Sequence, residues 1–314
     1  MKNKVYFVVP YFGVFPNYFQ LWLDSCARNS EFNWLLLTDC ITDSFKIPEN
    51  VIVKFTSLGE VKKTIETTLS INIVLDTSYK LCDFKPTYWI LLDSYGIDYD
   101  FWGHCDIDLI FGKLNQFITD DLLDKYDRIY SEGHLSLMSK SPISKYAFKL
   151  EGSEYKWDTV FKDAKIFGFD EHHGVNKIWK KQGLLYFENN AAILDVDPQF
   201  NVFSLTHLPS NKSGQFFFLQ DGAIMQGWYK NQIFKTQEFA YIHFQKRKMA
   251  INSTLNSDDN FIISHLGFNK YDNLLTAISE LKLSAKSSLK DTLFSLRKLK
   301  TFYRFYINRI INGL

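Results

Sequence analysis

The N-terminal stretch "KVYFVVPYFGVFPNYFQLWLDSCARNSEFNWLLLTD", residues 4–39, carries the clearest signal of the fold. It opens on a short run of β-branched and aromatic residues that Pro10 ends, which is typical of a buried strand. Apolar residues then recur at helical spacing from Phe19 to Cys26, and a second apolar run covers residues 32–38. A strand, a helix and a strand at this distance predict a βαβ unit and a mostly parallel sheet.

The residues that follow continue this alternation of strands and helices. Residues 50–55 have the pattern of a third strand, and residues 57–69 that of a helix capped by Ser57. Ligands of parallel sheets bind outside the carboxyl ends of the strands. The residues expected at such ends are Tyr11, Phe12, Thr38, Asp39 and Asp106.

The rest of the chain has a less regular pattern. Residues 79–96 predict one helix that Gly96 ends, and residues 127–139 a strand pair that turns at Gly133. Two further helices follow, and strands and hairpins are expected over residues 189–244. No Gly-, Pro- or Ser-rich linker divides the chain before about residue 285.

Composition excludes several classes of protein. The net charge is +1 and the first 280 residues contain no run of Lys or Arg longer than three residues, so nucleic acid is not an expected partner. The four cysteines are scattered without a C-x-x-C pair, which indicates a reducing compartment. The first apolar run is too short for a signal peptide, and no stretch reaches the roughly 18 apolar residues of a membrane span. We therefore expect a cytoplasmic protein.

The segment "DFWGHCDIDL", residues 100–109, places Asp106 and Asp108 directly after an apolar strand. Such a pair can hold Mg²⁺ or Mn²⁺ against phosphate oxygens. The spacing alone leaves a metal–phosphate role and a structural role equally open. Two other D-x-D pairs, at 98/100 and 195/197, are expected to lie in turns.

Three other chemistries compete for this segment. An aspartyl phosphatase would carry its D-x-D near the first strand and a small hydroxyl residue soon after, whereas Leu109 follows here. A dinucleotide-binding dehydrogenase needs a Gly-rich first turn, which "PYFGVFP" lacks. His104 and Cys105 have no second pair at the spacing of zinc ligands.

The ordered set "VVPYFGVFPNYFQLWLDSCARN", "WLLLTD", "YKLCDFKPTYWILL", "DFWGHCDIDLIFG" and "YIHFQKRKM" resembles a family of bacterial glycosyltransferases found with capsule and O-antigen synthesis genes. The likeness covers roughly residues 4 to 250. It implies the glycosyltransferase-A fold, a Rossmann-like mixed, mostly parallel sheet flanked by helices. It also implies a nucleotide-sugar donor across the carboxyl ends of the sheet, with a divalent metal against its diphosphate.

The resemblance assigns roles to matching positions on the donor side. It implies that Asp106, Asp108 and a late histidine, His243, hold the metal, Mn²⁺ or Mg²⁺. Without the resemblance, His243 would be read as a structural residue at a strand end. The residues that it implies for nucleotide-sugar binding are Tyr11, Phe12, Asp39, Asp83, Lys85, Asp106, Lys246 and Arg247.

The acceptor side has fewer matching positions. His134 is the candidate for acceptor binding, and the candidate catalytic carboxylates are Asp170, Glu171 and Asp221. An inverting transferase needs such a carboxylate as a base. Each of these acids also fits an ordinary loop role. Retention of stereochemistry is favoured over inversion because a late histidine recurs in retaining members of the fold.

The expected organisation is a catalytic domain over residues 1–250, a helical extension over 251–285 and a basic amphipathic helix over 286–314. This last segment contains seven basic residues and one acid, with apolar residues at helical spacing. Such a helix suits an anionic membrane surface, although it can instead pack on the catalytic domain or on a partner chain.

Together these features predict a metal-dependent glycosyltransferase. It would move a hexose from a nucleotide-sugar, with a UDP-sugar expected, to a saccharide acceptor on a lipid carrier during surface polysaccharide synthesis. It would lie in the cytoplasm, or peripherally on the inner face of the cell membrane. The alternative is a non-catalytic nucleotide-sugar- or carbohydrate-binding protein of the same fold.

Overall fold

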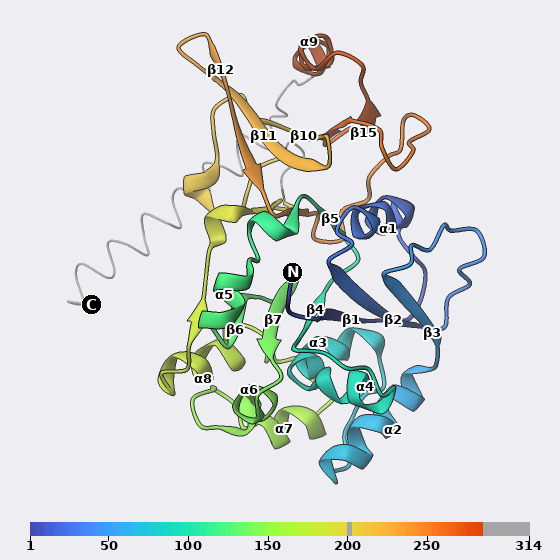
Figure 1. The fold of residues 1–314 in the computed structure, drawn as a ribbon, viewed down its shortest axis with the longest axis vertical. Coiled ribbons are helices and arrows are strands. Elements are labelled where there is room, and N and C mark those ends of the chain that lie inside the picture. The colour runs from blue at the N-terminus through green and yellow to red at the C-terminus, as the bar shows by residue number, and fades with distance from the viewer. Residues whose placement is uncertain (200–202, 285–314) are drawn as a thin grey trace, which may run out of the picture.

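The computed structural model describes residues 1–199 and 203–284, and Figure 1 shows its two parts: a sheet flanked by helices, and a smaller group of strands beside it. The larger part holds a seven-stranded sheet of order β3-β2-β1-β4-β7-β6-β8. Its strands are β1 (Val5–Tyr11), β2 (Phe32–Thr38), β3 (Val51–Phe55), β4 (Phe101–Cys105), β6 (Arg128–Glu132), β7 (Leu135–Ser139) and β8 (Tyr186–Phe187). Strand β7 runs antiparallel to both of its neighbours, and the other four pairings are parallel. The predicted mixed, mostly parallel sheet is confirmed.

The helices cover both faces of this sheet (Figure 1). They are α1 (Phe19–Ala27), α2 (Leu58–Leu69), α3 (Leu81–Phe84), α4 (Trp89–Ser94), α5 (Asp120–Lys125), α6 (Pro142–Tyr146), α7 (Trp157–Lys162) and α8 (Val175–Lys181). Because successive strand residues point to opposite faces, Phe7 packs with α1 in one apolar cluster and Val8 with α2 and α4 in another. The βαβ pattern predicted from residues 4–39 is therefore present.

The predicted helix over residues 79–96 is broken in the structure. Helices α3 and α4 are separated by a 3-10 turn at Lys85–Thr87. Pro86 lies in this turn, and a proline has no backbone N–H for a continuous helical ladder. The break has a consequence for the site, because it places the Lys85 side chain at the edge of β4, where its amine reaches Asp106.

The smaller part is a five-stranded antiparallel sheet of order β12-β11-β10-β14-β15. Its strands are β10 (Phe216–Gln220), β11 (Ala223–Lys230), β12 (Ile233–Phe239), β14 (Phe261–Ser264) and β15 (Gly267–Lys270). The predicted helical extension over 251–285 is thus mostly strand and loop, and only α9 (Leu274–Ser284) is helical. Strand β14 pairs with β10, so the predicted boundary at residue 250 cuts through this sheet. The predicted basic helix over 286–314 lies outside the described residues.

A third, three-stranded sheet joins these two parts. It consists of β5 (Leu109–Phe111), β13 (Tyr241–His243) and β9 (Ile193–Asp195), in the order β5-β13-β9. His243 is in register with Leu109 on one side and with Asp195 on the other. Segments far apart in the sequence therefore meet directly beside the acid pair. Among the described residues, no helix combines the length and apolar character needed to cross a bilayer.

Candidate functional site

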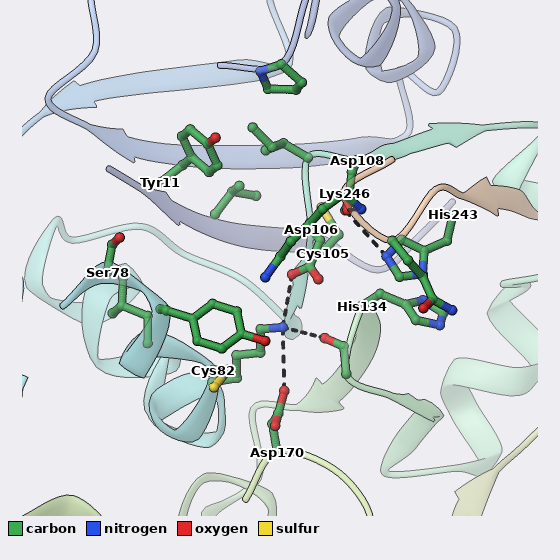
Figure 2. A pocket seen from close by; sticks show the side chains of 18 of the residues that line it. Tyr11, Ser78, Cys82, Cys105, Asp106, Asp108, His134, Asp170, His243 and Lys246 are labelled. Carbon is green, nitrogen blue, oxygen red and sulfur yellow. Dashed lines mark hydrogen bonds and ion pairs between the residues drawn. The ribbon is translucent and has the colours of Figure 1, made fainter. Parts of the chain in front are cut away.

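A cavity of about 1300 Å³ opens at the carboxyl ends of β1 and β4. Its wall includes Tyr11 from the end of β1 and Asp106 and Asp108 from the segment after β4. The loop after β13 contributes Lys246, and the loop before α8 contributes Asp170. In Figure 2 these labelled side chains surround one common space. Of the five residues that the sequence predicted at strand ends, Tyr11, Phe12 and Asp106 line this cavity, and Thr38 and Asp39 do not.

The predicted metal ligands come together in this cavity. Asp106, Asp108 and His243 each offer one ligand atom, and the three atoms lie within 4.8 Å of one another. Two carboxylates and one imidazole suit Mn²⁺, and a set dominated by oxygen also suits Mg²⁺. The donor set and its convergence therefore fit the predicted divalent cation.

His243 lies between two carboxylates at the end of β13. Its Nε2 is 3.4 Å from Asp108 Oδ1, and its Nδ1 is 2.8 Å from Asp195 Oδ1. Burial lowers the pKa of His243, but the hydrogen bonds with Asp108 and Asp195 outweigh burial and raise it to about 10. Burial in turn raises the pKa of Asp108, and the contact with His243 lowers it to about 2. The three side chains form a charged acid–imidazolium–acid row.

Asp108 is also held by the chain that follows His243. The backbone N–H of Lys246 donates to Asp108 Oδ2 at 2.6 Å, and the N–H of Phe244 donates to the Asp108 carbonyl at 3.0 Å. Lys246 adopts a positive φ of 60°, which turns this loop back over the acid pair. The D-x-D segment and the late histidine segment are therefore one structural unit.

Asp195 is a site residue that sequence reasoning placed in a turn. It ends β9, lines the cavity, and accepts hydrogen bonds from His243 and from the side-chain amide of Gln245. The signal that could have found it is the one used for Asp106, since Asp195 also follows an apolar run, "AAIL". The pairing of β9 with β13 brings His243 to Asp195, and no local sequence pattern indicates that pairing.

Lys85 connects the acid pair with the loop before α8. Its Nζ donates to Asp106 Oδ1 at 2.9 Å and to the Gly133 carbonyl at 2.6 Å, and lies 3.5 Å from Asp170 Oδ2. Burial lowers the pKa of Lys85, but the charges of Asp106 and Asp170 outweigh it, so that the pKa is well above its usual value. Burial raises the pKa of Asp170 to about 7. The cavity thus contains a charged lysine beside a carboxyl that titrates near neutrality.

His134 is a buried residue beside His243 in the cavity wall. Tyr241 Oη is 3.0 Å from His134 Nδ1, and the rings of His134 and His243 are 4.2 Å apart at an angle of 32°. Burial and then the positive charge of His243 lower the pKa of His134 to about 3. His134 is therefore a neutral, buried side chain that touches the cavity wall. This position favours support of His243 over the predicted contact with an acceptor.

Three predicted site residues do not line the cavity. Asp83 is fully buried, pairs with Lys80 Nζ at 2.8 Å, and accepts the backbone N–H of Phe169 at 2.9 Å. Asp39 is exposed and accepts the N–H of Gly13 at 3.3 Å. Asp221 is exposed in the β10–β11 turn, on the antiparallel sheet. These three residues therefore lie outside the cavity lining, and their assignment to the site stays a prediction.

The remaining predicted residues do line the cavity: Tyr11, Phe12, Glu171, Lys246 and Arg247. Lys246 is exposed, and its Nζ lies 3.7 Å from the centre of the Tyr79 ring, on the opposite wall. A guanidinium N–H of Arg247 donates to the Asp197 carbonyl at 3.2 Å. Aromatic rings and cations therefore line the same cavity as the acid pair.

Comparisons with solved structures found proteins described as glycosyltransferases. A crystal structure of the galactosyltransferase LgtC in complex with donor and acceptor sugar analogues is 13% identical over 61% of this chain and 75% of that chain, with a TM-score of 0.33. The apo form of the glycosyltransferase GlyE in Streptococcus pneumoniae TIGR4 is 14% identical over 61% of this chain, with a TM-score of 0.29. A second GlyE structure is 12% identical over the same share, with a TM-score of 0.27. These matches span 46% and 47% of the GlyE chains.

No curated protein matches this chain. A family model described as "Family of unknown function (DUF6625)" matches residues 7–272, from β1 through β15. That description names no activity, so the resemblance to capsule and O-antigen transferases stays a prediction. Because the match covers most of the chain, including every residue that lines the cavity, the chain belongs to the DUF6625 family of unknown function.

Proposed function

We propose that this protein is a metal-dependent glycosyltransferase that uses a nucleotide-sugar donor and a saccharide acceptor. The observation that carries the proposal is the convergence of Asp106, Asp108 and His243, within 4.8 Å, on a cavity of about 1300 Å³. A cavity of this size has room for a nucleotide-sugar and part of an acceptor, because pockets for drug-sized ligands measure about 300–1,000 Å³.

Different cavity residues would bind the cation, the diphosphate and the nucleobase of the donor. Asp106, Asp108 and His243 would hold the cation, which when bound neutralises the negative charge that develops on a leaving diphosphate. Lys246 is an exposed cation beside these ligands and can bind diphosphate oxygens directly. Tyr11, at the other end of the wall, offers an aromatic face to a nucleobase.

Asp170 is the strongest candidate among the predicted catalytic carboxylates. It lines the cavity beside Lys85, and burial raises its pKa to about 7, close to the pH at which a general base works best. Glu171 also lines the cavity, whereas Asp221 is exposed and does not line it, so Asp221 has less support as a catalytic residue. An inverting reaction would use Asp170 as the base for the acceptor hydroxyl. In a retaining reaction, which remains the favoured form, Asp170 would bind that hydroxyl without removing its proton.

The finer parts of the proposal concern substrate and location. We propose a UDP-hexose donor, Mn²⁺ or Mg²⁺ as the cation, and a lipid-linked saccharide acceptor in surface polysaccharide synthesis. The basic segment 286–314 would bring a cytoplasmic enzyme to the inner face of the membrane, because each Lys or Arg at an anionic surface contributes about 1 kcal/mol. Truncation after Ala285 is then expected to abolish binding to anionic liposomes and to leave donor hydrolysis intact.

The decisive experiment measures slow hydrolysis of nucleotide-sugars with Mn²⁺ and with EDTA. Wild-type protein is expected to hydrolyse one donor only when the metal is present. Asp108→Asn, which keeps the shape of the side chain, is expected to lower the rate more than tenfold. The exposed Asp121→Asn in α5 serves as the matched control and should leave the rate unchanged. Donor binding without hydrolysis would instead identify a nucleotide-sugar-binding protein, and retention of the Asp108→Asn rate would contradict the metal assignment.

A further inference from the structure

Asp195 contacts His243 from the neighbouring strand. It ends β9, in register with His243 on the parallel strand β13, and the backbone N–H of Val196 donates to the His243 carbonyl at 3.0 Å. The backbone pairing therefore fixes the distance between the two side chains. Within it, Asp195 Oδ1 and His243 Nδ1 meet at 2.8 Å.

The Asp195 carboxylate is itself held from two sides. The side-chain amide of Gln245 donates to Oδ1 at 2.8 Å and to Oδ2 at 2.9 Å. The hydroxyl of Thr206 donates to Oδ2 at 2.6 Å. With both oxygens engaged, the carboxylate plane cannot rotate freely, so the acceptor offered to His243 keeps one direction. A carboxylate that only balanced charge would not need these additional donors.

We propose that Asp195, oriented by Gln245, is a positioning residue that presents Nε2 of His243 to the divalent cation. The inference rests on the proposed metal site and extends it to two residues that the acid pair does not include. The metal-free imidazolium carries a hydrogen on each nitrogen, and a ligand must release the one on Nε2. The hydrogen that stays on Nδ1 and points at Asp195 then leaves the lone pair of the neutral imidazole on Nε2. That atom is the one that faces Asp108, at 3.4 Å from Oδ1. Metal-bound histidines generally donate their second N–H to a carboxylate in this way.

The arrangement distinguishes positioning from direct ligation. Asp195 Oδ1 reaches the histidine on its Nδ1 side, whereas the acid pair faces its Nε2 side. If Asp195 acts only through His243, its removal should matter only while His243 is present. If Asp195 were a ligand, its removal should weaken the metal site in either background. A double-mutant cycle between the two residues therefore separates these roles.

The test is titration of the full-length protein with Mn²⁺ by calorimetry, without nucleotide. Asp195→Ala is expected to weaken Mn²⁺ binding by about 10–100-fold, the range found for residues behind metal ligands. Asp195→Asn, which keeps an acceptor for the Nδ1 hydrogen, should lose less, and Gln245→Ala should lie between Asp195→Asn and wild type. In the His243→Ala background, Asp195→Ala should change affinity less than twofold. Asp121→Ala is the control.

Thermal unfolding in EDTA checks that each variant is folded. If Asp195→Ala does not fold, the Mn²⁺ affinities of Asp195→Asn and Gln245→Ala are used instead. Unchanged Mn²⁺ affinity in these variants, or an equal loss with and without His243, would overturn the inference. The readout is independent of turnover. Metal binding that depends on Asp195 in a protein that hydrolyses no donor would contradict the proposed function and keep this inference.

Discussion

Lys85 Nζ lies 2.9 Å from Asp106 Oδ1, with the lysine buried and the aspartate 38% exposed. The amine also donates to the Gly133 carbonyl, in the turn between β6 and β7. One buried cation thus ties the first acid of the pair to the neighbouring hairpin. Asp106 can face the cavity in a fixed direction because the buried Lys85 amine holds one of its carboxylate oxygens.

Replacement of Lys85 by methionine tests this support. The change leaves Asp106 and Asp170 without their shared cation, and loss of one partner from a buried pair typically costs about 3–5 kcal/mol. We expect a loss of this order in urea unfolding. The exposed pair of Lys4 and Asp98 gives a matched control, since Lys4→Met should hardly move the unfolding midpoint. Equal effects of the two substitutions would contradict a buried, supporting role for Lys85.

A second prediction concerns the pH dependence of stability at Asp170. Burial raises the pKa of its carboxyl from 3.8 to about 7, so the folded state holds a proton that the unfolded state has already released. Stability from this group is therefore present below about pH 4 and is lost as the pH rises towards 7.

Asp170→Asn removes this dependence. Relative to wild type, the variant should become progressively more stable between about pH 4 and pH 7 and then level off. Thermal unfolding of both proteins across this range measures the difference. Asp221→Asn, on the exposed turn, should show no such trend. A constant difference for Asp170→Asn would show that the carboxyl ionises normally.

A third prediction concerns the row formed by Asp108, His243 and Asp195 in the metal-free protein. The pKa of His243 is raised to about 10, so its contribution to stability is complete below about pH 6.5 and is lost as the pH rises through 10. The pKa values of the two acids are lowered to about 2, so their contribution is present above about pH 4 and is lost as the pH falls through 2.

His243→Gln removes the cation from this row. In EDTA, the destabilisation caused by His243→Gln should be largest between about pH 4 and 6.5 and should shrink towards pH 10. Chemical unfolding at several pH values measures it. A destabilisation that is the same at pH 6 and pH 10 would mean that His243 is neutral in the folded protein.

A fourth prediction tests the close approach of strands beneath the site. A Cβ atom on Gly103, in the middle of β4, would lie 2.1 Å from the Ser136 carbonyl oxygen on β7. Because the clash is with backbone, Gly103→Ala should cost about 3 kcal/mol or more in urea unfolding. Gly59→Ala in α2, where the nearest atom is 3.8 Å away, should be neutral or stabilising by up to about 1 kcal/mol. Wild-type stability of Gly103→Ala would contradict the tight β4–β7 pairing.

The sequence predicted the parts of the site whose signal is local. Asp106 follows an apolar run, and that was enough to place it at a strand end beside Tyr11. His243 was placed by resemblance, and the structure brings it to the acid pair. Asp83 was predicted to bind the nucleotide-sugar, but Lys80 and the backbone of residues 167–169 enclose it, so that it does not line the cavity.

Other features depended on contacts between distant segments. Asp195 looked like a turn residue because Pro198 follows closely, and its partner is 48 residues away. Residues 261–270 form a hairpin where a helical extension was predicted. The strand signal "FIIS" and the turn signal of Gly267 were present in the sequence but were not used. Periodicity shows which face of an element is apolar, but it does not show which other element will cover that face.

The three-stranded sheet has a consequence for the order in which the protein matures during synthesis. Strand β5 emerges from the ribosome early, directly after the acid pair, whereas its partner β13 emerges only after most of the chain. Chains fold from the N-terminus while synthesis proceeds, so the parallel sheet can form long before β13 arrives. Until then Asp108 lacks both its histidine and the Lys246 amide. The proposed metal site is therefore expected to be complete only after β13 and Lys246 have been synthesised, so a nascent chain should not bind the cation before then.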